Sequence, residues 1–171
     1  MTEKRQVWVH GTSVQVEYPD KLERHARKGW GTRLLGKYQT KNWFHFSIPT
    51  VALTDNIAPI LHSIYVLYDA KGFFLGGIQN VHIYDGPKRL FAFDDLAFPN
   101  YIGDHSETID EFNCWDVSER KKRIFLGLGI SVGVLFTQAG VEGGLSQITF
   151  TAAGAKFSYD QPGNHIITPI S

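Results

Sequence analysis

The length, composition and charge of the chain restrict its class. The chain has 171 residues and a mass of 19.3 kDa, so we expect residues 1–171 to form one domain. Seventeen Lys and Arg balance 17 Asp and Glu, and this zero net charge argues against a nucleic-acid binder and against a membrane partner. A single cysteine, Cys114, excludes an intrachain disulfide and multi-cysteine metal sites.

The first residues and the most apolar segment predict a cytoplasmic protein. The chain begins with polar residues and lacks the apolar region and cleavage site of a secretory signal. The most apolar run, Ile124–Phe136, is shorter than the roughly 20 residues of a spanning helix and contains glycines. We therefore interpret it as a buried strand.

The dominant hydrophobic period is two, which is typical of β-strands. In chain order, Gln6–His10 and Ser13–Tyr18 predict a hairpin around Gly11-Thr12. Asp20–Lys28 predicts a helix, with Asp20 as its N-cap and Gly29 after its end. Further strands are predicted at Asn42–Ile48, Leu61–Tyr68, Phe73–Leu75, Gln79–Tyr84, Arg89–Phe93, Arg123–Phe136, Leu145–Phe150 and Lys156–Tyr159, with one helical turn at Ser106–Phe112. About eight or nine strands predict an all-β antiparallel sandwich or jelly roll, with a closed β-barrel as the alternative.

The strand at Ile124–Phe136 has two different faces. One face is entirely apolar from Leu126 to Phe136, and the other carries Gly127, Gly129 and Gly133. A glycine inside a strand destabilises the fold by roughly 0.5–1 kcal/mol relative to alanine. Its presence therefore indicates that another group approaches the strand too closely to leave room for a side chain. Either bulky side chains of an adjacent strand cover the glycines, or the glycines form a smooth floor under a ligand or a second protomer.

Three predicted strands each place a histidine two positions from a large aromatic residue, opposite an apolar face. Such a surface suits sugar rings or other flat, partly polar ligands if the strands share one sheet. The alternative is an ordinary half-exposed sheet surface. The chain lacks H-x-H and H-E-x-x-H spacings, so we predict no metal site and no cofactor. The candidate ligand-binding residues are Trp8, His10, Trp43, His45, His82 and Tyr84.

Charge is segregated along the chain. Lys21–Lys41 contains seven basic residues and one acid, whereas Asp104–Glu119 contains six acids and no Lys or Arg. Both segments are compatible with solvated loops. The acidic segment alternatively holds Ca²⁺, although it lacks the EF-hand pattern. In a third interpretation, the two segments meet within one chain or between protomers.

The sequence matches no known catalytic motif in a suitable structural context, so we predict no catalytic residue. Gly129-x-Ser131-x-Gly133 has the letters of a nucleophile elbow. However, it lies inside an alternating strand, whereas an elbow needs a strand-to-helix turn. Cys114 lies among aromatic residues and is typical of a small packed side chain.

Three sequence motifs indicate a protein family. WVHGTS at 8–13 with EYP at 17–19, NWFHFSIP at 42–49 and VHIYDG at 81–86 resemble a family of small, uncharacterised, mostly bacterial proteins classed as a domain of unknown function. The resemblance covers about residues 7–137, and the segment from Val141 lies outside it. The resemblance implies an intact β-sandwich, and it implies no enzymatic or binding activity.

The leading functional prediction is a non-catalytic β-sandwich that acts through self-assembly or protein interaction, as a homo-oligomer. The first alternative is a carbohydrate-binding or lectin-like module that uses the aromatic and histidine face. The second is a histidine-based enzyme that acts with or without a metal ion.

Overall fold

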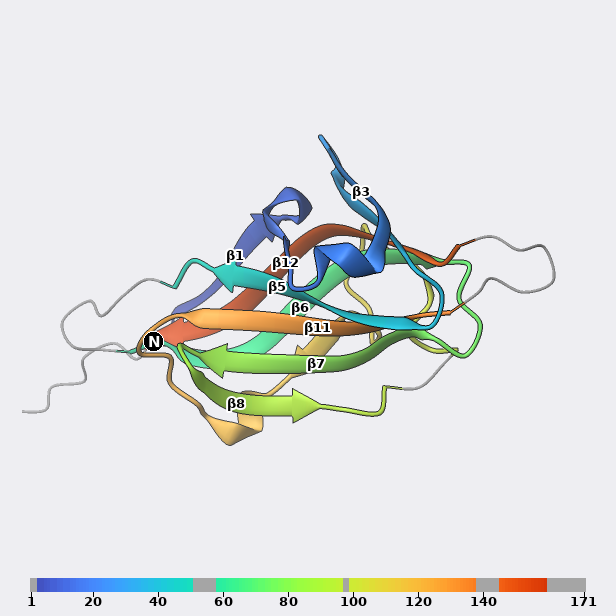
Figure 1. Ribbon diagram of the computed structural model, residues 1–171. Helices are drawn as coiled ribbons and strands as arrows, with labels where there is room; N and C mark the ends of the chain where they lie inside the picture. Colours follow the sequence, from blue (N-terminus) through green and yellow to red (C-terminus); the bar gives the residue numbers. More distant parts are fainter. Residues whose placement is uncertain (1–2, 51–57, 97–98, 138–144, 160–171) are drawn as a thin grey trace, which may run out of the picture.

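Two antiparallel sheets packed face to face make up the described part of the chain (Figure 1). The structure is a computed structural model that describes residues 3–50, 58–96, 99–137 and 145–159. These residues contain twelve strands and three short 3-10 helices. The all-β sandwich prediction is therefore confirmed. No helix in these four ranges is long and apolar enough to span a membrane.

The larger sheet has seven strands. Its order is β10 (Cys114–Asp116), β6 (Ile60–Lys71), β12 (Gln147–Tyr159), β4 (Gly31–Gly36) and β3 (Leu22–Lys28), with β1 (Glu3–His10) on β12 and β9 (Gly103–His105) on β6. The first part of β12 pairs with β4 and the second part with β1, on either side of a register shift after Phe150.

The smaller sheet has five strands and lies in front of β6 and β12 in Figure 1. Its order is β2 (Gln15–Val16), β5 (Thr40–Ile48), β11 (Leu128–Phe136), β7 (Gly77–Asp85) and β8 (Lys88–Phe93). β5 buries every second residue from Asn42 to Ile48, and β11 does the same apart from Gly133, which is also covered. In β7, Val81 and Ile83 are buried on the inner side, but His82 is buried as well. This alternation fixes which side chains face solvent.

Aromatic side chains join the two sheets in the core. The Phe150 ring of β12 lies 5.4 Å from the rings of both Phe44 and Phe46 of β5. Phe44 also meets Phe136 of β11 edge to face at 6.2 Å. All four phenylalanines are almost completely buried.

The predicted hairpin at the N-terminus is wrong. β1 pairs with β12 in the larger sheet, whereas β2 pairs with β5 in the smaller one. The short 3-10 helix Gly11–Ser13 carries the chain between the sheets. Gly11 is required there because a Cβ at this position would overlap the backbone carbonyl of Phe150.

Both helical predictions are also wrong. The 22–28 segment is the edge strand β3, which pairs with β4 to form a hairpin. Only Leu22 of this strand is buried, so the segment has no apolar stripe for a helix to bury. In the 106–112 segment, side chains replace helical hydrogen bonds, since Asp110 accepts the N–H of Phe112 and Asn113 donates to the Thr108 carbonyl.

Several strand boundaries differ from the prediction. β11 begins at Leu128 instead of Arg123, because the preceding residues wrap around the Asp85 carboxylate. Leu126 is consequently 75% exposed instead of buried. The 73–75 segment is a bend, and the two predicted C-terminal strands are one strand, β12.

Candidate functional site

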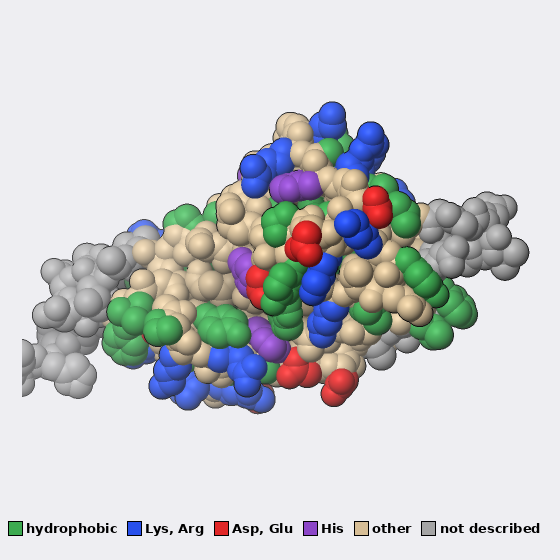
Figure 2. All heavy atoms as spheres, in the orientation of Figure 1, with side chains coloured by type: hydrophobic (Ala, Val, Ile, Leu, Met, Phe, Trp, Pro, Cys, Tyr) green, Lys and Arg blue, Asp and Glu red, His purple; other side chains and the backbone are tan. Residues whose placement is uncertain are grey.

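The outer face of the five-stranded sheet brings together four of the six predicted ligand-binding residues. Trp43 and His45 come from β5, and His82 and Tyr84 come from β7. The intervening strand β11 aligns them, because Ser131 lies opposite both histidines in the register. In Figure 2, His side chains lie among acidic, basic and hydrophobic side chains over the middle of this face.

The structure does not bring the other two predicted residues to this face. Trp8 and His10 lie on β1 in the seven-stranded sheet. The Trp8 ring stacks on Tyr65 with the ring centroids 5.1 Å apart and lies over Gly154, its register partner. His10 Nδ1 is 2.9 Å from the Thr12 hydroxyl. The six residues therefore form two separate surfaces.

The indole of Trp43 lies over a glycine at the centre of the outer face. Gly133 of β11 is its register partner, and a Cβ on Gly133 would lie 3.1 Å from the indole. The Trp43 ring is 4.9 Å from the His82 ring and 5.4 Å from Lys41 Nζ. A bulky neighbour thus explains Gly133, as one of the two sequence interpretations predicts, whereas Gly127 lies outside the strand.

A histidine–carboxylate pair lies on the β7 side of Trp43. His82 Nε2 is 2.7 Å from Asp94 Oδ1, which also accepts a 2.6 Å hydrogen bond from Asn80 Nδ2. The His82 and Asn80 hydrogen bonds lower the pKa of Asp94. The carboxylate is therefore ionised near neutral pH and holds the imidazole in place.

A second pair lies on the β5 side. His45 Nε2 is 2.9 Å from Glu17 Oε2, and His45 Nδ1 is 2.8 Å from Ser131 Oγ. Hydrogen bonding from Tyr18, followed by the contacts with His45, lowers the pKa of Glu17. Both pairs lie beside the Trp43 indole, since His45 follows Trp43 by two residues on β5 and the His82 ring is 4.9 Å from the indole. The face therefore combines one apolar ring with fixed polar groups next to it.

The Glu17–His45–Ser131 chain has the composition of a nucleophile relay but lacks the surroundings of one. Ser131 lies in the middle of β11, which pairs with β5 on one side and β7 on the other. The backbone N–H groups of such a central strand are used by the sheet. Within the described residues, an oxyanion next to Ser131 would thus meet no free pair of backbone N–H donors, one of the arrangements that stabilise it in acyl transfer.

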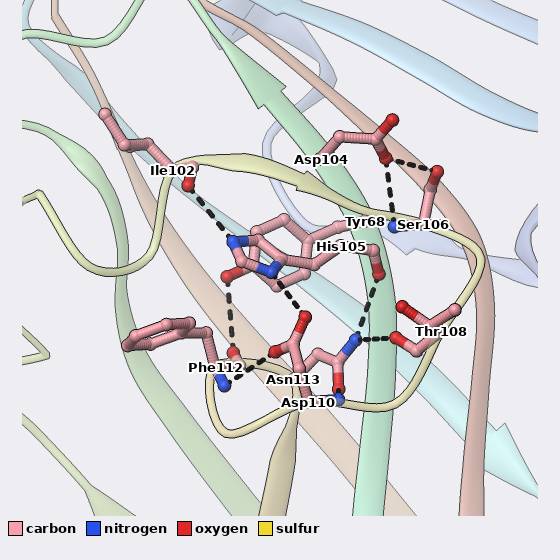
Figure 3. Close-up of polar contacts among 9 residues, drawn as sticks. All are labelled: Tyr68, Ile102, Asp104, His105, Ser106, Thr108, Asp110, Phe112 and Asn113. Carbon is pink, nitrogen blue, oxygen red and sulfur yellow. Dashed lines mark hydrogen bonds and ion pairs between the residues drawn. The ribbon is translucent and has the colours of Figure 1, made fainter.

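The acidic segment uses its carboxylates to order its own loop (Figure 3). Asp110 is 2.7 Å from His105 Nδ1, Asp104 accepts from Ser106, and Asn113 donates to two carbonyls of the loop. The buried Tyr68 hydroxyl donates to the Phe112 carbonyl. Across the described ranges, no group of three or more His, Cys, Asp or Glu side chains is placed to hold a metal ion.

Four residues of the outer face were absent from the predicted set: Glu17, Asn80, Asp94 and Ser131. Strand alternation could have predicted that Asn80 and Ser131 face outward, since each lies an even number of positions from the other outward residues of its strand. Asp94 and Glu17 follow the ends of β8 and β2, where alternation no longer determines direction.

The fold and this face define an antiparallel β-sandwich with an aromatic and histidine surface on its smaller sheet. The chain belongs to a family of unknown function, DUF6623, whose family model matches residues 2–161. The predicted membership of an uncharacterised family is thus confirmed, and the match extends beyond residues 7–137 on both sides. The comparison with curated proteins gave no match, and neither did the comparison with solved structures.

Proposed function

We propose that the protein is a non-catalytic binding module that recognises a sugar ring on the outer face of its five-stranded sheet. The observation that carries the proposal is the Trp43 indole, which lies over Gly133 and beside two histidine–carboxylate pairs. The C–H face of a pyranose packs on an aromatic ring, and its hydroxyls bond to carboxylates and imidazoles. A cytoplasmic location is part of the proposal and fits the single, partly buried Cys114 thiol.

The polar groups on this face are already oriented before a ligand arrives. Asp94 is held by His82 and Asn80, and Glu17 is held by His45. A ligand that bonds to these groups does not have to immobilise them, which reduces the entropic cost of binding.

The Trp43 indole is the proposed stacking surface for the sugar ring. In a glycan array followed by calorimetric titration of the best glycan, we expect Trp43→Ala to weaken binding at least about tenfold, the equivalent of roughly 1.4 kcal/mol. The loss follows from removal of the stacking surface. Binding of the same glycan is expected to remain in Trp8→Ala.

Trp8→Ala is a matched control because Trp8 also lies over its glycine register partner, but on the other sheet. Equal losses in both variants would assign the effect to stability instead of contact. An array without any bound glycan would overturn the proposal.

Self-association is the second candidate function, favoured by one exposed hydrophobic pair. Phe125 and Leu126 are 60% and 75% exposed, and the buried Asp85 carboxylate accepts their backbone N–H groups. Contiguous exposed apolar surface is typical of contact sites between proteins, and the hydrogen bonds to Asp85 hold these two adjacent residues in place. By contrast, the charged residues of β3 and the start of β8 disfavour pairing through sheet edges.

The second prediction is that the mass measured by light scattering rises with protein concentration. The double variant Phe125→Ser, Leu126→Ser is expected to remain monomeric. The control Phe74→Ser, Leu75→Ser removes another exposed pair, 57% and 63% exposed, and is expected to associate like the wild type. A monomeric wild type at every concentration would eliminate this candidate.

A further inference from the structure

A cleft of about 440 Å³ lies on the seven-stranded sheet, away from the face of Trp43. Trp30 and Arg33 of the β3–β4 hairpin line one side, and Ser106 and Glu107 of the loop after β9 line the other. Thr149 and Asp69 lie between them. The register explains this arrangement, because Thr149 of β12 is paired with Arg33 of β4 on one side and with Asp69 of β6 on the other.

The two oppositely charged segments of the sequence meet at this cleft, within one chain. The hairpin belongs to the basic segment and the loop to the acidic one. The loop is held in place, since Thr151 Oγ1 donates to the Ser106 carbonyl at 2.7 Å and Ser106 bonds to Asp104. The network around His105 and Asp110 orders the rest of the loop (Figure 3).

Opposite charges line the two sides of the cleft without pairing. Arg33 and Glu107 are both exposed, and no ion pair joins them in the described part of the chain. The Arg33 guanidinium lies 5.2 Å from the centroid of the Trp30 ring, which is itself 47% exposed. On the floor, Asp69 Oδ2 pairs with Lys71 at 2.6 Å, whereas the buried Asp69 Oδ1 has no donor among the described residues.

We propose that this cleft binds a small zwitterion of the α-amino-acid type. Its carboxylate pairs with Arg33, its ammonium group pairs with Glu107, and its apolar side chain packs against Trp30. A ligand with one charge would leave the opposite side of the cleft partly desolvated and unpaired, which costs free energy. The ammonium group also supplies a hydrogen-bond donor for the unpaired Asp69 Oδ1, which lies between the two sides. This inference does not depend on the sugar-binding proposal.

The test is an NMR titration of the indole N–H signals with three probes. L-Phenylalanine carries both charges, phenethylamine lacks the carboxylate, and 3-phenylpropionate lacks the ammonium group. We expect L-phenylalanine to shift the Trp30 signal and leave the Trp43 signal in place. Its affinity is expected to exceed that of each single-charge probe at least tenfold.

Charge-removing variants identify the two partners. In Glu107→Gln, L-phenylalanine and 3-phenylpropionate are expected to bind equally well, because the ammonium group has lost its partner. In Arg33→Gln, L-phenylalanine and phenethylamine are expected to bind equally well. Arg24→Gln and Glu111→Gln remove exposed charges of the same two segments outside the cleft and are expected to bind like the wild type.

Three results would overturn the inference. The first is the absence of any Trp30 response to L-phenylalanine at its solubility limit. The second is an equal affinity of the wild type for all three probes. The third is a Trp30 shift with D-glucose equal to that with L-phenylalanine, which would make the cleft a neutral sugar site. Arg33→Gln and Glu107→Gln replace exposed side chains, so both variants are expected to fold. A backbone NMR spectrum that matches that of the wild type checks this.

Discussion

Replacing Phe150 with alanine is expected to lower the free energy of unfolding by about 3–5 kcal/mol, the range for a large aromatic residue in a core. The Phe150 ring is completely buried and contacts Phe44 and Phe46 from the opposite sheet. Its removal leaves a cavity between the sheets that both phenylalanines border. Rigid strands on both sides prevent that cavity from collapsing, so the transfer cost and the cavity cost add.

Urea unfolding followed by tryptophan fluorescence measures this effect. Phe125→Ala is the matched control, because the Phe125 ring is 60% exposed, and its cost is expected to stay within about 0.5 kcal/mol. A cost below about 1 kcal/mol for Phe150→Ala would be typical of a surface position. That outcome would contradict the packing of the two sheets around this ring.

Local alternation was sufficient to predict the faces of β5 and β7. Phe44 and Phe46 point inward and Trp43 and His45 outward, because the pleat turns successive side chains to opposite sides and the core takes the apolar set. The same reasoning predicted the burial of five of the six apolar positions on one face of the expected strand Arg123–Phe136. It failed at Leu126, where the hydrogen bonds of a distant carboxylate, Asp85, end the strand.

The sheet to which each strand belongs was not predictable from local pattern. Trp8 and Trp43 each stand two residues before a histidine, yet they lie on different sheets. The difference is made by pairing with partners far along the chain, Gly154 for Trp8 and Gly133 for Trp43. A single sequence contains no record of such pairings. The helix expected at 20–28 failed for the same reason, since cross-strand pairing with β4 outweighed its capping signals.

For the candidate sites, too, local alternation predicted which side chains face outward but not which strands and loops lie next to each other. Outward parity placed His45, Ser131 and His82 in one row once β5, β11 and β7 were adjacent. The contact between the basic and acidic segments was one of the alternatives that the charge pattern left open. The identity of the residues that line the cleft, such as Arg33 and Glu107, depends on how the hairpin and the loop fold over β12, and charge segregation contains no information about that.

Replacing Asp85 with asparagine is expected to lower the free energy of unfolding by about 1–3 kcal/mol at pH 7, the cost of losing charged hydrogen bonds to partly buried donors. Oδ1 accepts the N–H groups of Leu126 and Gly127, and Oδ2 accepts that of Phe125, at 2.7–3.1 Å. An asparagine turns an N–H₂ group toward at least one of these donors. Asp95→Asn, at an exposed position, is the control and is expected to change stability by less than about 0.5 kcal/mol.

The cost of Asp85→Asn is expected to depend on pH. Burial raises the pKa of Asp85, but the three backbone hydrogen bonds outweigh it, so the pKa lies below the ordinary value of 3.8. A carboxyl with a depressed pKa in the folded state stabilises the protein fully above its unfolded pKa, and this contribution is lost as the pH falls through the folded value. Urea unfolding between pH 7 and pH 3 should therefore show the difference between wild type and Asp85→Asn shrinking below about pH 4. A difference that stays constant across this range would mean that the carboxylate charge does not hold the loop, and the fixed display of Phe125 and Leu126 would need another cause.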